Sequence, residues 1–100
     1  MFKELERNIL TVSGKTRELL EEAEKEVRMY EARAELTQMR VNTLEYLYTY
    51  GGEKYGEDLE GAYEDHEIVI DDLHRAQYTV KNLTTILDSM RVAYAAYTEL

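Results

Sequence analysis

Apolar residues in the second half of the chain recur at alternating steps of three and four. The series runs without a break from Leu59 to Tyr97, and eleven of its twelve members are apolar or aromatic. This heptad spacing places side chains on one face of an α-helix. It predicts a helix over about 58–99. We call the inner face of this helix the seam, and it consists of Leu59, Ala62, His66, Val69, Leu73, Ala76, Val80, Leu83, Leu87, Met90, Tyr94 and Tyr97.

The first half follows the same rule with one irregularity. Two steps of four adjoin between Leu19 and Val27, which predicts an 11-residue phase correction within a helix over about 2–50. Gly14 weakens a helix and Ser13 can cap one, so a break near 13–14 and a short separate N-terminal helix stay open. The expected inward residues are Phe2, Leu5, Ile9, Val12, Thr16, Leu19, Ala23, Val27, Tyr30, Ala34, Thr37, Val41, Leu44 and Tyr48.

The glycines of GGEKYGE, near the middle of the sequence, predict a loop at about 51–57 between the two helices. The fold class is therefore all-α: one domain over residues 1–100, built as a long antiparallel, coiled-coil-like hairpin. Further apolar residues widen both faces beyond what a two-stranded pair covers, and these are Leu20, Leu36, Met39, Leu47, Tyr63, Ile70, Ile86 and Ala93. We expect two hairpins to dimerise into a four-helix bundle, or the extra apolar surface to bind a different protein. In the dimer, the oligomer seam would use Leu59, His66, Leu73, Val80, Leu87 and Tyr94.

Composition excludes several classes of protein. Cysteine is absent, which suits a reducing, cytoplasmic location, and no uncharged apolar run approaches the roughly 20 residues of a membrane span. The charged first residues do not resemble a signal peptide. We therefore expect a soluble protein. Neither Ser13 nor Ser89 has a histidine close in sequence that could activate it, so we also expect a protein that is not an enzyme and needs no cofactor.

The net charge of −9 is concentrated after the predicted loop. Nine acids and one base lie between Glu53 and Asp72. Steps of three and four place part of them on one stripe opposite the seam: Glu57, Glu60, Glu64, Glu67 and Asp71, followed by His74 and Tyr78. Such a stripe repels the phosphates of nucleic acid and attracts a basic protein surface or a cation, although a charged face also simply keeps a bundle soluble.

The eight carboxylates over residues 57–72 give about one charge per 2.8 Å of helix, between the densities of duplex and single-stranded nucleic acid. The hypothesis is a decoy for a basic nucleic-acid-binding groove, in the manner of small inhibitors encoded by viruses or mobile elements. Tyrosines gather near the same loop, where they suit recognition or the packing of the bundle end. The predicted partner site is Tyr48, Tyr50, Tyr55, Glu57, Glu60, Glu64, Glu67 and Asp71.

A metal site is the second hypothesis. Asp71 and His74 form an acid-x-x-His pair with Glu67 one turn earlier, and the first helix would bring Glu35 or Glu31 alongside. This resembles the Glu-x-x-His ligands of ferritin-like bundles, which bind two metal ions. The heptad seam, however, turns Asp71 and His74 outward.

Two short motifs remain. The run Ser13-Gly14-Lys15-Thr16 matches the end of a phosphate-binding loop, but Ile9 stands where the first glycine is needed and no strand precedes it. Tyr50-Gly51-Gly52 resembles the Trp-x-Gly turn of the helical-hairpin substrates of type VII secretion, which implies an exported hairpin. Their Tyr-x-x-x-acid signal is not present at Tyr94, because Thr98 occupies the acidic position.

Overall fold

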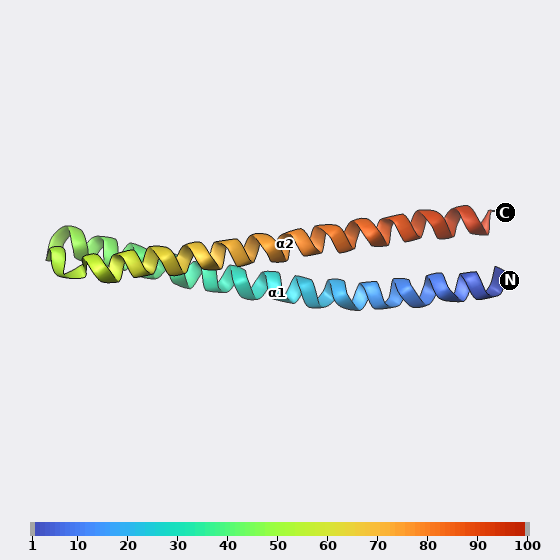
Figure 1. The fold of residues 1–100 in the computed structure, drawn as a ribbon, viewed down its shortest axis with the longest axis horizontal. Coiled ribbons are helices and arrows are strands. Elements are labelled where there is room, and N and C mark those ends of the chain that lie inside the picture. The colour runs from blue at the N-terminus through green and yellow to red at the C-terminus, as the bar shows by residue number, and fades with distance from the viewer. Residues whose placement is uncertain (1, 100) are drawn as a thin grey trace. The chain divides into compact units, whose positions relative to one another are not determined.

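A computed structural model describes residues 2–99, with side chains from residue 3 onward, and shows a helical hairpin (Figure 1). Helix α1 spans Phe2–Gly51, the short 3-10 helix η1 spans Glu53–Tyr55, and helix α2 spans Gly56–Thr98. No strand occurs among the described residues. The predicted all-α hairpin is therefore confirmed.

The turn between the helices depends on one glycine. Gly52 has φ 102°, a backbone conformation that side chains disfavour, and its N–H donates to the carbonyl of Tyr48 at 3.2 Å. Helix α2 begins at Gly56 rather than near residue 58, and η1 occupies the middle of the predicted loop. Glu57 and Asp58 lie in the first turn of α2, where the helix dipole favours negative charge.

Helix α1 continues through Gly14, so the short separate N-terminal helix that the sequence left open does not form. A Cβ atom at Gly14 would meet nothing within 4 Å, which shows that this glycine lies on an open side of the helix. The hydroxyl of Ser13 lies 3.4 Å from the sulfur of Met90 and does not serve as a helix cap.

Contacts divide the hairpin into two compact units. Unit 1 consists of Met1–Lys25 and Gln77–Leu100, and unit 2 is the continuous segment Glu26–Ala76, which includes the turn. Within unit 1, the start of α1 lies beside the end of α2 (Figure 1). There the hydroxyl of Tyr94 donates to the carboxylate of Glu6 at 3.2 Å.

The α2 seam follows the sequence pattern closely. All twelve predicted positions are buried or partly buried, and Ala62 and Ala76 are the most enclosed. The six residues assigned to an oligomer seam are partly buried within the single chain already.

The register predicted for the beginning of α1 is wrong. Leu5, Val12 and Leu19 are 49%, 48% and 53% exposed, and Tyr48 near the turn is 43% exposed. The buried or partly buried row instead alternates by three and four from Glu6 to Leu44, without the predicted phase correction: Glu6, Ile9, Ser13, Thr16, Leu20, Ala23, Val27, Tyr30, Ala34, Thr37, Val41 and Leu44, followed by Leu47.

The regular row has a physical reason. Because the heptad of α2 is unbroken, α1 stays in step with it only by keeping the same spacing throughout. This brings the polar residues Glu6 and Ser13 inward, where Tyr94 and Met90 of α2 contact them. Thr16 is 7% exposed, and its hydroxyl donates to the carbonyl of Val12 at 2.8 Å.

The core is thin. The buried apolar residues are Ala23, Val41, Ala62 and Ala76, and among the described residues no large side chain is completely buried. Most large apolar residues keep part of their surface in water. Little hydrophobic stabilisation is therefore available inside one chain.

Candidate functional site

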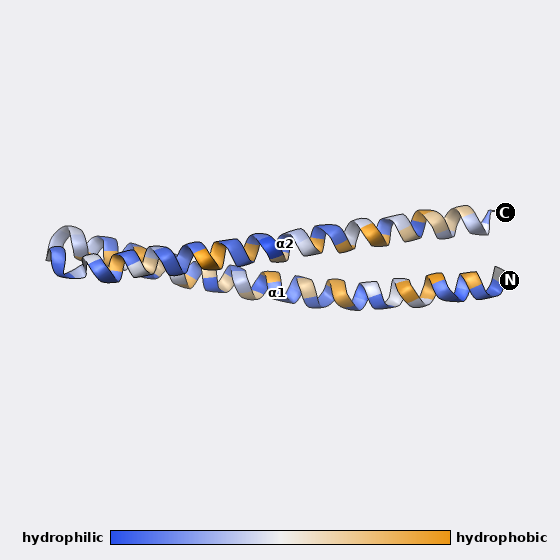
Figure 2. Cartoon of the chain, viewed as in Figure 1, coloured by the Kyte–Doolittle hydropathy of each residue, from blue (hydrophilic) through white to orange (hydrophobic). Residues whose placement is uncertain are grey.

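The negative charge of the protein lies almost entirely in unit 2. Unit 2 has thirteen acidic and five basic residues, a net charge of −8, whereas unit 1 has eight and seven, a net charge of −1. Hydrophilic residues accordingly dominate α2 near the turn (Figure 2). Any partner selected by charge would meet unit 2.

The predicted acidic stripe is exposed along its whole length, at Glu57, Glu60, Glu64, Glu67 and Asp71. Two ion pairs of unit 2 involve acids outside this stripe. Asp65 pairs with Arg40 at 2.8 Å, and Asp72 lies 3.9 Å from Arg75. Its exposure leaves the stripe accessible to a partner along α2.

The three tyrosines assigned to the partner site have different surroundings. Tyr50 is 76% exposed, and its ring lies 4.7 Å from that of Tyr46 between centroids. Tyr55 is partly buried and packs over Gly51, where a Cβ atom would come within 2.7 Å of its ring. The ring of Tyr48 similarly lies against Gly56. Tyr50 is thus available to a partner, while Tyr48 and Tyr55 pack at the turn.

A second exposed series lies on α1, and the sequence reasoning recognised its members only separately, with Leu36 and Met39 beside the seam and Tyr50 in the partner site. Its members also alternate by three and four, on the side of α1 opposite the seam: Met29, Ala32, Leu36, Met39, Thr43, Tyr46 and Tyr50. All seven are exposed, Leu36 by 66% and Met39 by 63%. We call this row the outer stripe. The signal was present in the sequence as a second apolar period, out of phase with the first.

Near the turn, a tyrosine and a carboxylate connect the helices of unit 2. The hydroxyl of Tyr63 donates to the carboxylate of Glu45. This hydrogen bond raises the pKa of Tyr63, and partial desolvation and the negative charge of Glu45 raise it further. The Tyr63 hydroxyl therefore keeps its proton at neutral pH, and its hydrogen bond to Glu45 links the two helices there.

The residues of the metal hypothesis do not converge within the chain. Glu67, Asp71 and His74 are all exposed on α2. Glu35 lines a shallow depression beside the other histidine, His66. Across residues 2–99, no group of three or more His, Asp or Glu side chains is placed to hold a metal ion.

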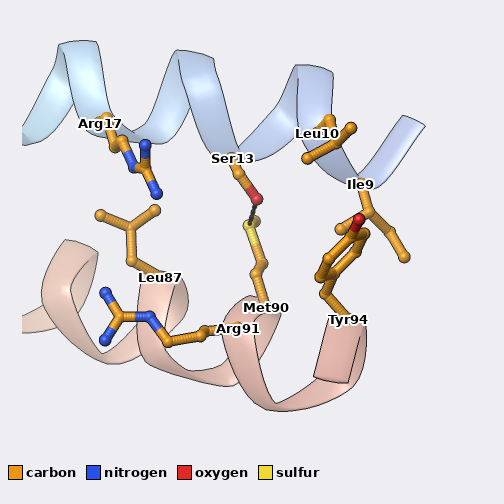
Figure 3. Close-up of a pocket in the computed structure, with 8 residues that line it drawn as sticks. All are labelled: Ile9, Leu10, Ser13, Arg17, Leu87, Met90, Arg91 and Tyr94. Atoms are coloured by element: carbon orange, nitrogen blue, oxygen red, sulfur yellow. Dashed lines mark hydrogen bonds between the residues drawn. The ribbon is translucent and has the colours of Figure 1, made fainter. Parts of the chain in front are cut away.

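Unit 1 contains a different kind of surface (Figure 3). A pocket of about 210 Å³ between its helices is lined by Ile9, Leu10, Ser13, Arg17, Leu87, Met90, Arg91 and Tyr94. Arg17 of α1 and Arg91 of α2 lie near Leu87 in this pocket. This side of unit 1 therefore carries positive charge at its edge.

No protein-family model, curated protein or solved structure matches this chain. Within residues 2–99, neither helix has a stretch apolar and long enough to cross a membrane. The acidic stripe and the outer stripe, both on unit 2, are the surfaces best suited to recognition.

Proposed function

We propose that this chain is a non-enzymatic interaction protein that self-associates through its helices and binds a protein with a basic surface through unit 2. The observation that carries the proposal is the net charge of −8 on unit 2, with the acidic stripe exposed along α2 from Glu57 to Asp71. An array of one sign steers an oppositely charged protein toward it and repels nucleic acid.

Charge alone gives specificity more than affinity, so a stable complex also needs apolar anchors. Unit 2 offers them on its other helix. Leu36, Met39 and Tyr50 of the outer stripe are each more than 60% exposed. A partner that reached both faces would combine charge recognition with apolar burial, which favours a macromolecule over a small ligand.

The charge density of the stripe supports a specific version of this function. Its carboxylates are spaced closely enough to imitate the phosphates of nucleic acid, so the basic partner would be a nucleic-acid-binding protein whose groove the stripe occupies. An inhibitor encoded by a virus or a mobile element would act in this way.

Self-association is supported by the thin core. The chain exposes 7860 Å². A folded monomer of 11.8 kDa is expected to expose about 5,900 Å². The excess exceeds the roughly 800 Å² that each partner buries in a standard interface. Two hairpins that form a four-helix bundle would cover part of this surface.

The test is affinity capture from the native host with the wild-type chain and a charge-reversed variant, in which Glu60, Glu64, Glu67 and Asp71 are changed to Lys. The matched control reverses four exposed acids of unit 1, Glu18, Glu21, Glu22 and Asp88. We expect the wild type and the control to retain the same basic protein and the unit 2 variant to lose it. Circular dichroism checks that all three chains remain helical.

Retention of the partner by the unit 2 variant would contradict the proposal. Duplex DNA added during capture tests the decoy version separately. If the stripe occupies a nucleic-acid groove, DNA in excess releases the partner; if the partner stays bound, the decoy version is wrong while the interaction itself stands.

A further inference from the structure

We infer that one edge of unit 1 is the surface on which a second copy of this chain docks. We call it the apolar flank, and it consists of Leu5, Val12, Leu19, Ile86 and Ala93. The inference rests on the self-association proposed above and assigns that self-association to the apolar flank. It also separates self-association, in unit 1, from partner binding, in unit 2.

The flank lies beside the seam on both helices. Leu5, Val12 and Leu19 each immediately precede an inward residue of α1, and Ile86 and Ala93 immediately precede Leu87 and Tyr94 of α2. All five side chains are exposed. Val12 and Ala93 line one shallow depression together with Asn8, Ile9 and Met90, which shows that the two helices share this edge.

The start of α1 has an apolar face that α2 covers only in part. Its apolar row is Leu5, Ile9, Val12 and Leu19, whereas the row that is partly buried contains Glu6, Ser13 and Leu20. The helix is thus turned so that half of its apolar face lies in the hairpin and half lies beside it. In a four-helix bundle, a wider apolar face of this kind contacts two neighbours.

The corresponding edge of unit 2 is charged. There Arg40 and Asp65, which also immediately precede seam residues, form an ion pair at 2.8 Å. The other edge of unit 1 carries Arg17 and Arg91 (Figure 3). The continuous apolar edge is therefore confined to one side of unit 1.

Charge decides in favour of a second copy as the occupant. Unit 1 has a net charge of −1, so two copies can meet there without strong repulsion. Association through unit 2 would instead bring two units of −8 together. The same flank on both copies forms an isologous interface with a twofold axis, which is the commonest arrangement of homodimers.

The test is the mass of the full chain by analytical ultracentrifugation, for the wild type, Val12→Glu and Val92→Glu. Val92 is a matched control because it lies in unit 1, is 70% exposed and is outside the flank. We expect a wild-type dimer, a dimer for Val92→Glu, and a dissociation constant raised on the order of a hundredfold for Val12→Glu, since the interface would bury two unpaired carboxylates.

A monomeric wild type, a Val12→Glu chain that stays dimeric, or equal dissociation of both variants would overturn the inference. If circular dichroism shows that Val12→Glu has lost its helices, single cysteines decide instead. The chain has no cysteine of its own. Cysteines placed one at a time at Leu5, Val12 and Leu19 should give a disulfide-linked dimer under mild oxidation at the position nearest the twofold axis, and Val92→Cys should not. A cross-link at Val92 with none at the three flank positions rejects the flank. These measurements use no partner protein. A negative result would therefore reject the flank as the dimer interface without testing partner binding by unit 2, which the capture experiment tests.

Discussion

The hydroxyl oxygen of Thr37 in α1 lies 2.6 Å from Nδ1 of His66 in α2, which places a polar pair in the seam of unit 2. The Thr37 hydroxyl also lies 3.1 Å from the carbonyl of Ala34. Because a hydroxyl has one proton, it can donate to Ala34 while Nδ1–H of His66 donates to it. The pair satisfies the Thr37 hydroxyl and Nδ1 of His66, and it links the two helices at one register.

This pair predicts an asymmetric effect of mutation. Thr37→Val leaves Nδ1 of His66 without its partner and should lower the free energy of unfolding by about 1–2 kcal/mol. The double change Thr37→Val with His66→Leu should recover most of that loss, because an apolar pair suits the seam. Urea denaturation measures each step. Thr43→Val is the control, since Thr43 is exposed and should change stability by less than about 0.5 kcal/mol. Additive effects of the two seam changes would show that the side chains are not coupled.

Two glycines should respond in opposite directions to alanine. Gly14 lies within the continuous α1 with open space around it, so Gly14→Ala should raise stability by about 1 kcal/mol. Gly52 has φ 102°, so Gly52→Ala should lower stability by about 1–2 kcal/mol. Thermal unfolding followed by circular dichroism measures both. A destabilised Gly14→Ala would indicate that α1 bends or breaks there after all.

Tyrosine ionisation should weaken the hairpin at alkaline pH. Hydrogen bonds to Glu45 and Glu6 raise the pKa values of Tyr63 and Tyr94 above the usual value of about 10. A raised pKa in the folded state means that the stabilisation is complete below the unfolded pKa and is lost as pH rises through the folded one. Glu45→Ala should therefore return the pKa of Tyr63 toward its usual value, measured by NMR titration with Tyr63→Phe for assignment. An unchanged Tyr63 titration would mean that the hydrogen bond is absent in solution.

Metal should not be retained by the protein. The candidate ligands Glu67, Asp71 and His74 are exposed on α2, and Glu35 lies near His66 instead of His74. After incubation with iron or manganese and gel filtration, we expect elemental analysis to find about zero bound ions per chain, because a stable metal site needs several ligands held together. Stoichiometric metal that Asp71→Asn removes would instead support a ferritin-like site completed by a second chain.

The sequence predicted the hairpin and the α2 seam because the heptad from Leu59 to Tyr97 has a single dominant phase. It did not predict the start of α1, where two neighbouring rows compete. The row with Leu5, Val12 and Leu19 is more apolar, but the row with Glu6, Ser13 and Leu20 keeps α1 in step with α2. Apolar content alone could not reveal that Tyr94 would hydrogen-bond to Glu6 and that Met90 would contact Ser13.

The candidate site was predicted in part. The acidic stripe on α2 was readable because its spacing and charge coincide, and its residues are exposed as expected. On α1, Leu36 and Met39 were predicted to widen the inner face, but they belong to the outer stripe, because a second apolar period in the same helix is out of phase with the seam. Tyr48 and Tyr55 show the remaining difficulty, since a sequence does not distinguish a tyrosine that packs against a turn glycine from one that faces solvent.

The central claim is that unit 1 self-associates and unit 2 binds the partner. The most direct test is to purify the captured partner and measure its co-sedimentation with Val12→Glu and with the charge-reversed unit 2 variant. We predict that Val12→Glu sediments as a monomer and still binds the partner, while the charge-reversed chain stays dimeric and does not. A folded Val12→Glu chain that no longer binds the partner, or a charge-reversed chain that still binds it, would contradict the assignment of partner binding to unit 2 alone.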